Sequence, residues 1–475
     1  MGQGKIAIIG AGPAGMACAL ELYKANKNFV VIEKENCVGG LSKTYSFGKF
    51  KTDNGPHRFF SKNKYLYEMI ESLLGEKWIK VNRFTRFYID GKFYKYPIEP
   101  LDVISKISPL KATKIMFDYV KEKLKPKRDP KNFEDYIVSK FGKTLAEFNI
   151  LNYTEKVWGL KCSELSWEWG EQRIKGLSIK ALLKNAFFKG NKPKTLVDQF
   201  FYPELGTGMI YEAIREKVET KNKFIFNVVP EKIFVKEKKV EKIVLSNGSE
   251  IINPSWVISS IPITELCKIV YPKPSEKVFV ASSKLKFRSQ VYLFITINKP
   301  SVAKDQWIYF PNKEIPLGRI SEMKNFSKKM APENKTSLFI EFFCWKNDSF
   351  WKMEKEELLS IASHWLEKLG LVKNSEILDS YLLREEFVYP VYDLDYKKNL
   401  SVVLDYFDSF DNLICIGRPG RFKYTNQDHS LEMGILAARS IIEGKKYEID
   451  KVGSEKDYFE KWQLYSKESN SQQNS

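Results

Sequence analysis

A glycine-rich turn close to the start of the chain restricts what its N-terminal part can fold into. Residues 5–9, KIAII, favour a short β-strand, and GAGPAG follows at once at residues 10–15. MACALELYKANK then shows helical periodicity, and FVVIE at residues 29–33 is typical of a second strand. This order of strand, glycine turn, helix and strand predicts a parallel βαβ unit of the Rossmann type, and hence an α/β fold.

The glycine turn predicts a dinucleotide-binding site, because each part of it has a physical role there. Gly10 permits the tight turn, Gly12 lets a pyrophosphate approach the backbone, and Gly15 lets the helix pack on the sheet. The helix N-terminus offers free N–H groups to phosphates, and Glu33 can accept both ribose hydroxyls of an adenosine. The cofactor-binding residues expected in this unit are Gly10, Gly12, Pro13, Ala14, Gly15, Glu33 and Lys34.

Length and cysteine usage indicate a multi-module protein of a reducing compartment. A chain of 475 residues is too long for one compact core. No apolar run approaches the roughly 20 residues of a membrane-spanning helix, and the apolar start is interrupted by glycines and a proline, unlike a signal peptide. The 6 cysteines are scattered without a C-x-x-C pair, so neither a disulfide framework nor a metal site is expected. We expect a cytoplasmic protein.

The net charge of +18 comes mainly from lysine and fits several kinds of partner. Nucleic acid, an acidic membrane surface and phosphate-bearing substrates would all be attracted, but a solvated lysine-rich surface is the simplest interpretation. No nucleic-acid-binding motif is present, so no nucleic-acid partner is expected. Peripheral membrane contact and homo-oligomer formation stay open.

Motifs after Glu33 indicate which dinucleotide binds. A Gly39-Gly40 pair is followed by an extended stretch that reaches DNGPH, residues 53–57. This pattern resembles the flavoprotein superfamily of amine oxidases, protoporphyrinogen oxidase and UDP-galactopyranose mutase, in which a second glycine loop runs along FAD. A hairpin-like segment at 224–251, a strand at 256–262 and a strand–loop–helix at 412–442 fit the same superfamily. The resemblance implies FAD as the cofactor, held also by Gly40, Leu41, His57, Val229, Gly417, Arg418, Asp428 and Met433.

The same resemblance implies a domain organisation. A Rossmann-like FAD-binding domain is expected to be discontinuous, over residues 1–60, 205–275 and 400–448. Residues 61–204 read as a largely helical insert, in which Asp90-Gly91 signals a β-hairpin turn. Strand-like runs at 276–399 predict a mixed-sheet substrate domain, and the polar residues 466–475 predict a disordered tail.

Four motifs narrow the resemblance to UDP-galactopyranose mutases. Gly55-Pro56-His57 is followed by Phe59, as in the mutase loop that enters the flavin site. YTEKVWGLKCSEL contains Tyr153 and Trp158 at mutase-like positions, and PLGRISEMK places Arg319 where the mutases carry a diphosphate-binding arginine. GRPGRFKYTNQD supplies Arg418, Tyr424 and Asp428 at the positions of residues near flavin and diphosphate.

The mutase resemblance implies a function. Such an enzyme isomerises a nucleotide sugar between its pyranose and furanose forms, with N5 of reduced FAD as the nucleophile and no net redox change. A nucleotide sugar and a flavin reductant are the implied partners. The implied catalytic residues are His57 and Arg319, and the implied substrate-binding residues are Tyr153, Trp158, Arg173, Arg319 and Tyr424.

Several of the implied site residues could instead have a structural role. His57 could be a hydrogen-bonded turn residue, Tyr153 and Trp158 could be core aromatics, and Arg319 could belong to a structural ion pair. Phe60 stands where the bacterial mutases carry a second histidine, and no second diphosphate-binding arginine aligns securely near Arg173. The rival class is an FAD-dependent oxidoreductase of the protoporphyrinogen oxidase or amine oxidase type, in which the flavin accepts hydride.

Overall fold

The nucleotide-binding part is built on a five-stranded parallel sheet, which confirms the predicted α/β class. The computed structural model describes residues 5–96, 102–103, 105–126, 128–174 and 198–454, so the predicted disordered tail at 466–475 lies outside the described residues. The strand order is β20-β13-β1-β2-β9. The strands are β1 (Ile6–Ile9), β2 (Phe29–Ile32), β9 (Lys223–Ile225), β13 (Val257–Ser259) and β20 (Leu413–Cys415).

Both faces of this sheet are covered, and β1 shows how. Its alternate residues point to opposite faces, so Ala7 and Ile9 pack in one apolar cluster while Ile6 and Ile8 pack in another. The second cluster lies under α1 (Pro13–Lys24), α10 (Gly208–Val218) and α17 (Gln427–Glu443). The sheet takes strands from the three separated segments expected for the FAD domain.

A four-stranded sheet packs against the other face. Its order is β12-β11-β10-β14, and β10 and β11 form the hairpin expected within residues 224–251. Apolar residues of this hairpin, among them Ile233 and Ile243, share a cluster with Ala7 and Ile9. The strands are β10 (Pro230–Lys236), β11 (Lys239–Leu245), β12 (Glu250–Ile252) and β14 (Val270–Tyr271).

A seven-stranded mixed sheet forms the second half of the molecule, in the order β19-β15-β18-β17-β16-β6-β7. The predicted hairpin turn at Asp90-Gly91 is present, with positive φ at both residues. Its strands belong to this sheet, since β6 pairs with β16, so segment 61–204 contributes strands as well as helices. The strands are β6 (Thr85–Ile89), β7 (Lys92–Lys95), β15 (Phe287–Ile297), β16 (Trp307–Tyr309), β17 (Arg319–Ser321), β18 (Thr336–Cys344) and β19 (Ile377–Pro390).

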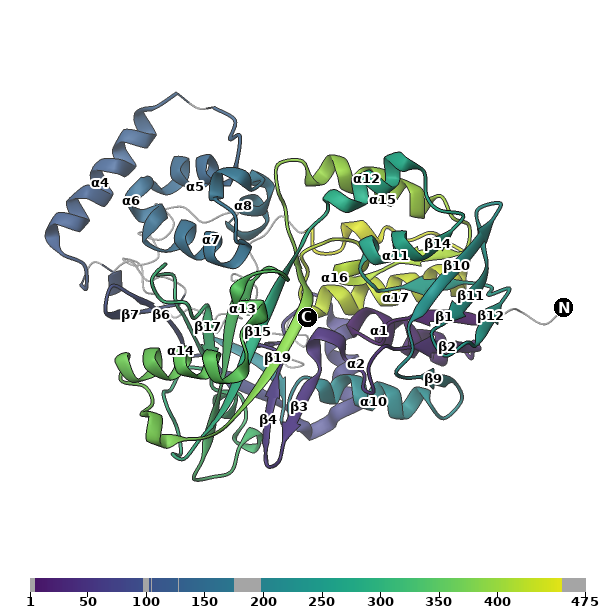
Figure 1. The fold of residues 1–475 in the computed structure, drawn as a ribbon, viewed down its shortest axis with the longest axis horizontal. Helices are drawn as coiled ribbons and strands as arrows, with labels where there is room; N and C mark the ends of the chain where they lie inside the picture. The colour runs from purple at the N-terminus through teal and green to yellow at the C-terminus, as the bar shows by residue number, and fades with distance from the viewer. Residues whose placement is uncertain (1–4, 97–101, 104, 127, 175–197, 455–475) are drawn as a thin grey trace, which may run out of the picture.

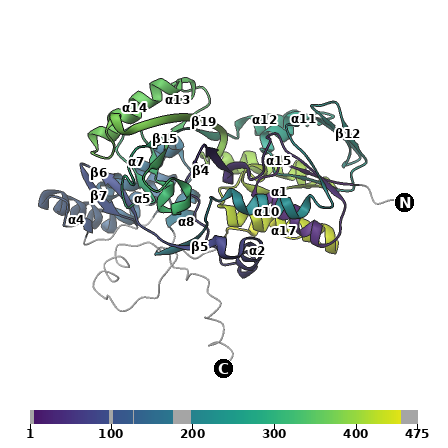
Figure 2. The ribbon, with the colours of Figure 1, turned by 90° about the horizontal axis from the view of Figure 1, so that it is seen from below.

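Helices enclose the second sheet from two sides. α14 (Lys355–Lys368) covers one face, with Leu358, Ala362 and Leu366 buried against β15 and β18. A second group of helices comes from the insert at residues 109–174. Its members are α4 (Pro109–Leu124), α5 (Phe133–Phe141), α6 (Lys143–Leu145), a π-helical turn (Ala146–Leu151), α7 (Asn152–Trp158) and α8 (Trp167–Ile174). Figures 1 and 2 show this helical group and the nucleotide sheet at opposite ends of the molecule.

The remaining elements connect these parts. A two-stranded ribbon of β3 and β4 ends at Asp53, the first residue of the DNGPH segment, and β5 pairs with β8. In the described part of the chain, no helix is both long and apolar enough to cross a membrane. The bounds are β3 (Thr44–Phe47), β4 (Phe50–Asp53), β5 (Trp78–Asn82), β8 (Gln199–Pro203), α2 (Lys64–Leu74), α11 (Ile263–Ile269), α12 (Glu276–Lys284), α13 (Ser349–Lys352), α15 (Tyr396–Asp408) and α16 (Gly417–Gly420).

The contact between α1 and α17 yields a stability prediction. A Cβ atom at Gly434 would lie 2.0 Å from the carbonyl oxygen of Ala14, so Gly434→Ala must push the two helices apart. We expect it to lower the free energy of unfolding by about 1–3 kcal/mol or more. Glu367→Ala, which changes an exposed side chain of α14, should change it by less than about 0.5 kcal/mol. Equal denaturant midpoints for the two variants would contradict this packing.

Candidate flavin and substrate site

A cavity of about 900 Å³ lies between the nucleotide-binding part and the seven-stranded sheet. It brings together residues that are far apart in the sequence, from the glycine turn to the start of α17. Among the sequence-predicted site residues, those lining it are Gly10, Gly12, Pro13, Ala14, Glu33, Lys34, Gly40, Leu41, His57, Tyr153, Trp158, Val229, Arg319, Gly417, Arg418 and Tyr424. Most of the predicted residues therefore meet in one place.

The glycine turn forms an open cradle on the cavity wall. Gly10 has a φ of +97°, and a Cβ there would lie 2.3 Å from Ser260 Oγ, so only glycine fits. Gly12 faces Gly40, whose own Cβ would lie 3.1 Å from the Gly12 Cα. Within the described residues, a Cβ at Gly12 would meet only the Gly40 Cα within 4 Å, at 3.9 Å. The backbone is thus bare where a pyrophosphate has to approach.

Glu33 is fixed at the end of β2 with its carboxylate in the cavity wall. Its two oxygens accept hydrogen bonds from the backbone N–H groups of Ala11, at 2.6 Å, and Glu35, at 3.0 Å. Burial raises the pKa of this carboxyl. The remaining lone pairs of the oxygens are available to hydroxyl groups of a ligand, as the sequence predicted for a ribose.

A buried carboxylate anchors the DNGPH segment. Asp53 accepts hydrogen bonds from Thr44 Oγ1 and the Tyr202 hydroxyl, both at 2.6 Å, and from the Thr207 N–H at 3.0 Å. Burial raises the pKa of Asp53 to about 6, against the effect of these donors. The next residues turn sharply at Gly55, where φ is +108°. The turn therefore stands on a fixed base and aims His57 at the cavity.

His57 is a neutral imidazole between two cations. Its Nδ1 is buried without a hydrogen-bond partner among the described residues. Burial, with the nearby guanidinium groups of Arg418 and Arg319, lowers the pKa of His57 to about 3. At pH 7 the ring is uncharged and its Nδ1 can bind a group that occupies the cavity.

The guanidinium group of Arg319 is held on β17 by an ion pair. Its Nε donates to Glu341 Oε1 at 2.6 Å and its Nη2 to Glu341 Oε2 at 2.7 Å. Glu341 is buried on β18 and also accepts from Gln290 Nε2. The structural ion pair that the sequence left open is thus present, and Nη1 of Arg319 remains available to a ligand.

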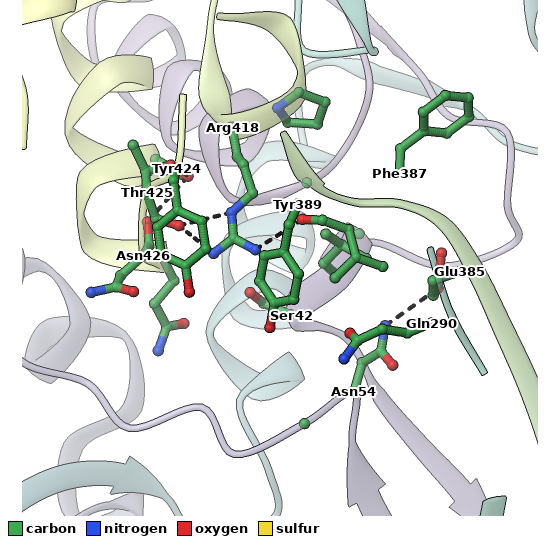
Figure 3. Close-up of a pocket in the computed structure, with 18 of the residues that line it drawn as sticks. Ser42, Asn54, Gln290, Glu385, Phe387, Tyr389, Arg418, Tyr424, Thr425 and Asn426 are labelled. Carbon is green, nitrogen blue, oxygen red and sulfur yellow. Dashed lines mark hydrogen bonds between the residues drawn. The ribbon is translucent and has the colours of Figure 1, made fainter. Parts of the chain in front are cut away.

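Arg418 is positioned by carbonyl groups instead of a carboxylate. Its Nε donates to the Thr425 carbonyl at 2.8 Å, where Nη2 also donates, and its Nη1 donates to the Val388 carbonyl at 3.1 Å. The guanidinium group lies beside the rings of both Tyr389 and Tyr424, at 5.3 Å and 5.2 Å from their centroids (Figure 3). Within the described residues no carboxylate pairs with Arg418.

Aromatic side chains wall the part of the cavity next to these arginines. Tyr153 packs edge-on against Tyr309 at 5.2 Å, and Tyr389 stacks on Tyr424 at 5.3 Å. Trp158 is only 1% exposed and packs edge-on against Trp169 at 4.8 Å. Trp158 therefore lines the cavity and also belongs to the core, and its contact with a substrate stays a prediction.

Three predicted site residues do not line the cavity in the described structure, and the position of a fourth, Arg173, is not tested. Gly15 packs under the turn, since a Cβ there would lie 1.9 Å from the Gly10 carbonyl oxygen. Met433 is buried in the core beside α1, and Asp428 is buried in the first turn of α17. Arg173 lies at the end of α8, and its side chain is outside the described residues.

Other cavity residues were not expected from the sequence. Asn54 has a buried Oδ1 with no partner in the described part of the chain, and its Nδ2 donates to Glu385 at 3.4 Å (Figure 3). Tyr389 and Glu385 come from β19, a long strand that the sequence analysis did not identify. The run FVY at residues 387–389, made of aromatic and β-branched residues that favour strands, was the signal that could have revealed them.

Comparison with known proteins gives the class of this fold and site. The sequence profile described as flavin containing amine oxidoreductase matches residues 13–392. The chain belongs to this family, so the expected flavoprotein class is confirmed. The bare cradle at Gly12, together with the unpartnered Asn54 Oδ1 and His57 Nδ1 in the same wall, fits a polar, phosphate-bearing flavin.

Individual relatives point in two directions. "Probable UDP-galactopyranose mutase" from Klebsiella pneumoniae is 27% identical over 175 residues, which make up 35% of this chain and 44% of that protein. The match thus spans less than half of that relative's length. The crystal structure of reduced UDP-galactopyranose mutase aligns with a TM-score of 0.84 and 23% identity, over 97% of this chain and 99% of that one. A structure described as "Putative protoporphyrinogen oxidase" from Exiguobacterium aligns with a TM-score of 0.73 and 15% identity, over 94% and 100%. Both structures show the shared fold.

The first site prediction concerns the charge of His57. The chain has 3 histidines, so a ¹³C-labelled sample gives few imidazole signals. The signal that is missing in His57→Gln is assigned to His57. With a pKa of about 3, this signal should not shift between pH 8 and pH 5, where a free imidazole would titrate near 6.5. A titration midpoint near 6.5 would contradict the buried, neutral state.

The depressed pKa of His57 should also make the free energy of unfolding depend on pH. The folded-state pKa of His57 is depressed, so the unfolded chain binds the proton first as the pH falls. Below about pH 6.5 the wild-type free energy of unfolding should fall faster than that of His57→Gln, by at most about 1.4 kcal/mol per pH unit. Urea unfolding of both proteins measures the difference, and parallel pH profiles would contradict it.

A further prediction tests the glycine cradle. Gly12→Val puts a branched side chain where the pyrophosphate must approach, and we expect a folded, colourless protein. Gly12→Ala adds only the Cβ and should reduce flavin content less. Circular dichroism checks the fold and the flavin absorbance per chain measures occupancy. Full occupancy in folded Gly12→Val would show that the flavin does not use this cradle.

Proposed function

We propose that this chain is a nucleotide-sugar mutase that uses FAD in its reduced form and interconverts pyranose and furanose forms of the sugar. The observation that carries the proposal is the pair of guanidinium groups, Arg319 and Arg418, beside the flavin cradle. Both act on the same two side chains, because each shifts the pKa of His57 and of Tyr389. Both charges therefore act on the same part of the cavity, which they line together, and this supports binding of an anionic group there.

The charge of this chamber favours an anionic ligand. Arg58, Arg319 and Arg418 all line the cavity, and the hydrogen bonds of Arg418 within the described structure go to carbonyl oxygens and not to a carboxylate. A diphosphate satisfies guanidinium groups through charge-assisted hydrogen bonds. A substrate that carries an ammonium group would instead be repelled by them. The site chemistry thus supports a nucleotide sugar over an amine.

Each group has a role in the proposed reaction. Reduced flavin, when bound, supplies a nucleophilic nitrogen for the anomeric carbon. Arg319 Nη1 and the Arg418 guanidinium hold the diphosphate as negative charge grows on it, and this contact strengthens as the glycosyl bond breaks. The hydroxyl groups of Tyr389 and Tyr424 complete the anion site. Tyr153 and Tyr309 exclude water from it, which strengthens these interactions.

An oxidoreductase is the second candidate, favoured by the family to which the chain belongs. The same guanidinium groups would bind a substrate that bears carboxylates, such as a porphyrinogen. In that reaction the oxidised flavin accepts hydride and an external acceptor is consumed at each turnover. The two candidates therefore differ in the starting redox state and in the stoichiometry of the acceptor.

The deciding experiment follows from this difference. Dithionite-reduced protein is incubated with UDP-galactopyranose and with UDP-galactofuranose, and the products are separated by chromatography. We expect interconversion in both directions, none with oxidised protein, and no stoichiometric consumption of reductant. The proposal fails if reduced protein leaves both sugars unchanged while oxidised protein consumes oxygen with a porphyrinogen or an amine.

A single hydroxyl group tests the anion site. Tyr389→Phe removes a hydrogen bond to a charged group, a loss of about 1.5–3 kcal/mol, so kcat/KM should fall by roughly one to two powers of ten. The control Tyr381→Phe lies on the same strand, where its ring stacks on Phe47 outside the cavity, and should retain wild-type turnover. Both variants should keep the flavin spectrum. Equal kcat/KM for the two would argue against a Tyr389 contact.

A test of Arg319 needs a variant that keeps a positive charge beside its partner, Glu341. Arg319→Ala would leave Glu341 buried without its cation, which destabilises a protein by about 3–5 kcal/mol and confuses the result. Arg319→Lys keeps the charge beside Glu341 but cannot serve the carboxylate and a ligand through one planar fork. We expect it to fold, bind flavin and lose at least about tenfold in kcat/KM. Unchanged kcat/KM in Arg319→Lys would remove Arg319 from the substrate site.

A further inference from the structure

The helix α4 carries an apolar face that the rest of the described chain leaves exposed. Its inner side lies against α5 and α6, yet the helix has no buried residue. On the outer side, apolar residues are between 47% and 81% exposed. These residues, here termed the α4 apolar face, are Leu110, Met116, Phe117, Val120 and Leu124.

The α4 apolar face is bordered by lysines and contains one polar residue, Thr113, whose hydroxyl donates to the Leu110 carbonyl oxygen at 2.9 Å. At 3.6 residues per turn its five members fall within a stripe about 120° wide. Lys114, Lys121 and Lys125 follow one edge of the stripe and Lys123 follows the other, and all four are exposed. Lys114 and Lys121 make no hydrogen bond or ion pair within the described residues. An apolar stripe flanked by lysines is the pattern of a helix that lies in a membrane interface.

The position of α4 allows such a contact. In both views it is the outermost element at the end of the molecule away from the nucleotide sheet (Figures 1 and 2). On its inner side, Lys111 Nζ donates to Asp90 Oδ2 at 2.7 Å. Asp118 Oδ2, on the same side, accepts from the Thr144 N–H at 3.1 Å. The apolar face therefore has a fixed outward direction.

We propose that the α4 apolar face docks this protein onto an anionic lipid surface. The face enters the headgroup region, and the bordering lysines contact anionic headgroups. The net charge of +18 adds long-range attraction to such a surface. This inference stands apart from the chemistry of the cavity.

A second copy of the chain fits the same face less well. A stable protein–protein interface takes roughly 20–30 residues from each partner, and this face offers five apolar ones. The carboxylates of α4, Asp118 and Glu122, are engaged with Thr144 and Lys125. Two such faces would bring lysine edges together without opposing carboxylates, whereas anionic lipid supplies the missing charge.

The test measures binding of the full-length holoprotein to vesicles by flotation. Vesicles of phosphatidylcholine with about one third phosphatidylglycerol should carry the protein, and pure phosphatidylcholine vesicles should carry far less. Phe117→Ser with Leu124→Ser should lower the partition coefficient about a hundredfold, because two exposed apolar side chains no longer enter the interface. The matched control, Leu378→Ser with Leu394→Ser, changes two exposed leucines elsewhere and should bind like the wild type.

The lysines are tested by charge removal. Lys114→Gln with Lys121→Gln should weaken binding to the anionic vesicles by roughly tenfold or more, since each lysine near anionic headgroups contributes about a factor of five. Lys239→Gln with Lys277→Gln, two exposed lysines outside α4, serves as the control. Added salt should weaken wild-type binding.

Three results would overturn the proposal. One is wild-type protein that does not float with anionic vesicles. The second is binding that the α4 variants and their controls reduce equally, because the attraction would then come from net charge alone. The third is a wild-type dimer in solution that the Phe117→Ser, Leu124→Ser variant dissociates, since a second copy would then cover the face. All four variants change exposed side chains, so unchanged melting temperatures confirm that they are folded.

Discussion

Close backbone contacts at three glycines hold the nucleotide-binding part together, and the site depends on them. Gly10 turns the chain out of β1 against Ser260, Gly15 lets α1 lie on that turn, and Gly434 lets α17 lie on α1. A side chain at any of these positions would occupy the space of a backbone or hydroxyl atom of its neighbour. The contact of α1 with α17 also brings the N-terminus of α17, with Asn426 and Gln427, into the cavity wall. Helix termini with free N–H groups thus converge where phosphates would lie.

The two arginines of the site are stabilised by different kinds of partner. Arg319 is balanced by Glu341, while Arg418 relies on carbonyl oxygens and the faces of two tyrosine rings. A buried cation without a full counter-charge is costly until an anion arrives. Burial, together with the two cations, keeps His57 neutral, and positive charge in a cavity favours a negative ligand. The anchor Asp53, in contrast, is held by hydroxyl and amide donors.

Positive charge serves different purposes in different parts of the molecule. In the cavity it is presented by arginines, whose planar groups suit phosphate oxygens and aromatic faces. At the surface it is carried by lysines, and on α4 these border an apolar stripe. The net charge alone could not separate these two uses, because it records neither burial nor neighbours.

Local sequence determined much of this protein. GAGPAG with flanking apolar runs identified the βαβ unit, and Asp90-Gly91 identified its hairpin, because turns and short periodic segments depend on neighbouring residues. The tertiary structure alone decided three other matters. It joined the β6–β7 hairpin to a sheet made mainly by residues 287–390, it brought Tyr389 and Glu385 to the cavity from an unexpected strand, and it paired Arg319 with Glu341. Pairing between distant strands and the burial of a charge depend on contacts that no local pattern contains. Local patterns could therefore identify candidate residues, but only the fold decided which residues pair with them.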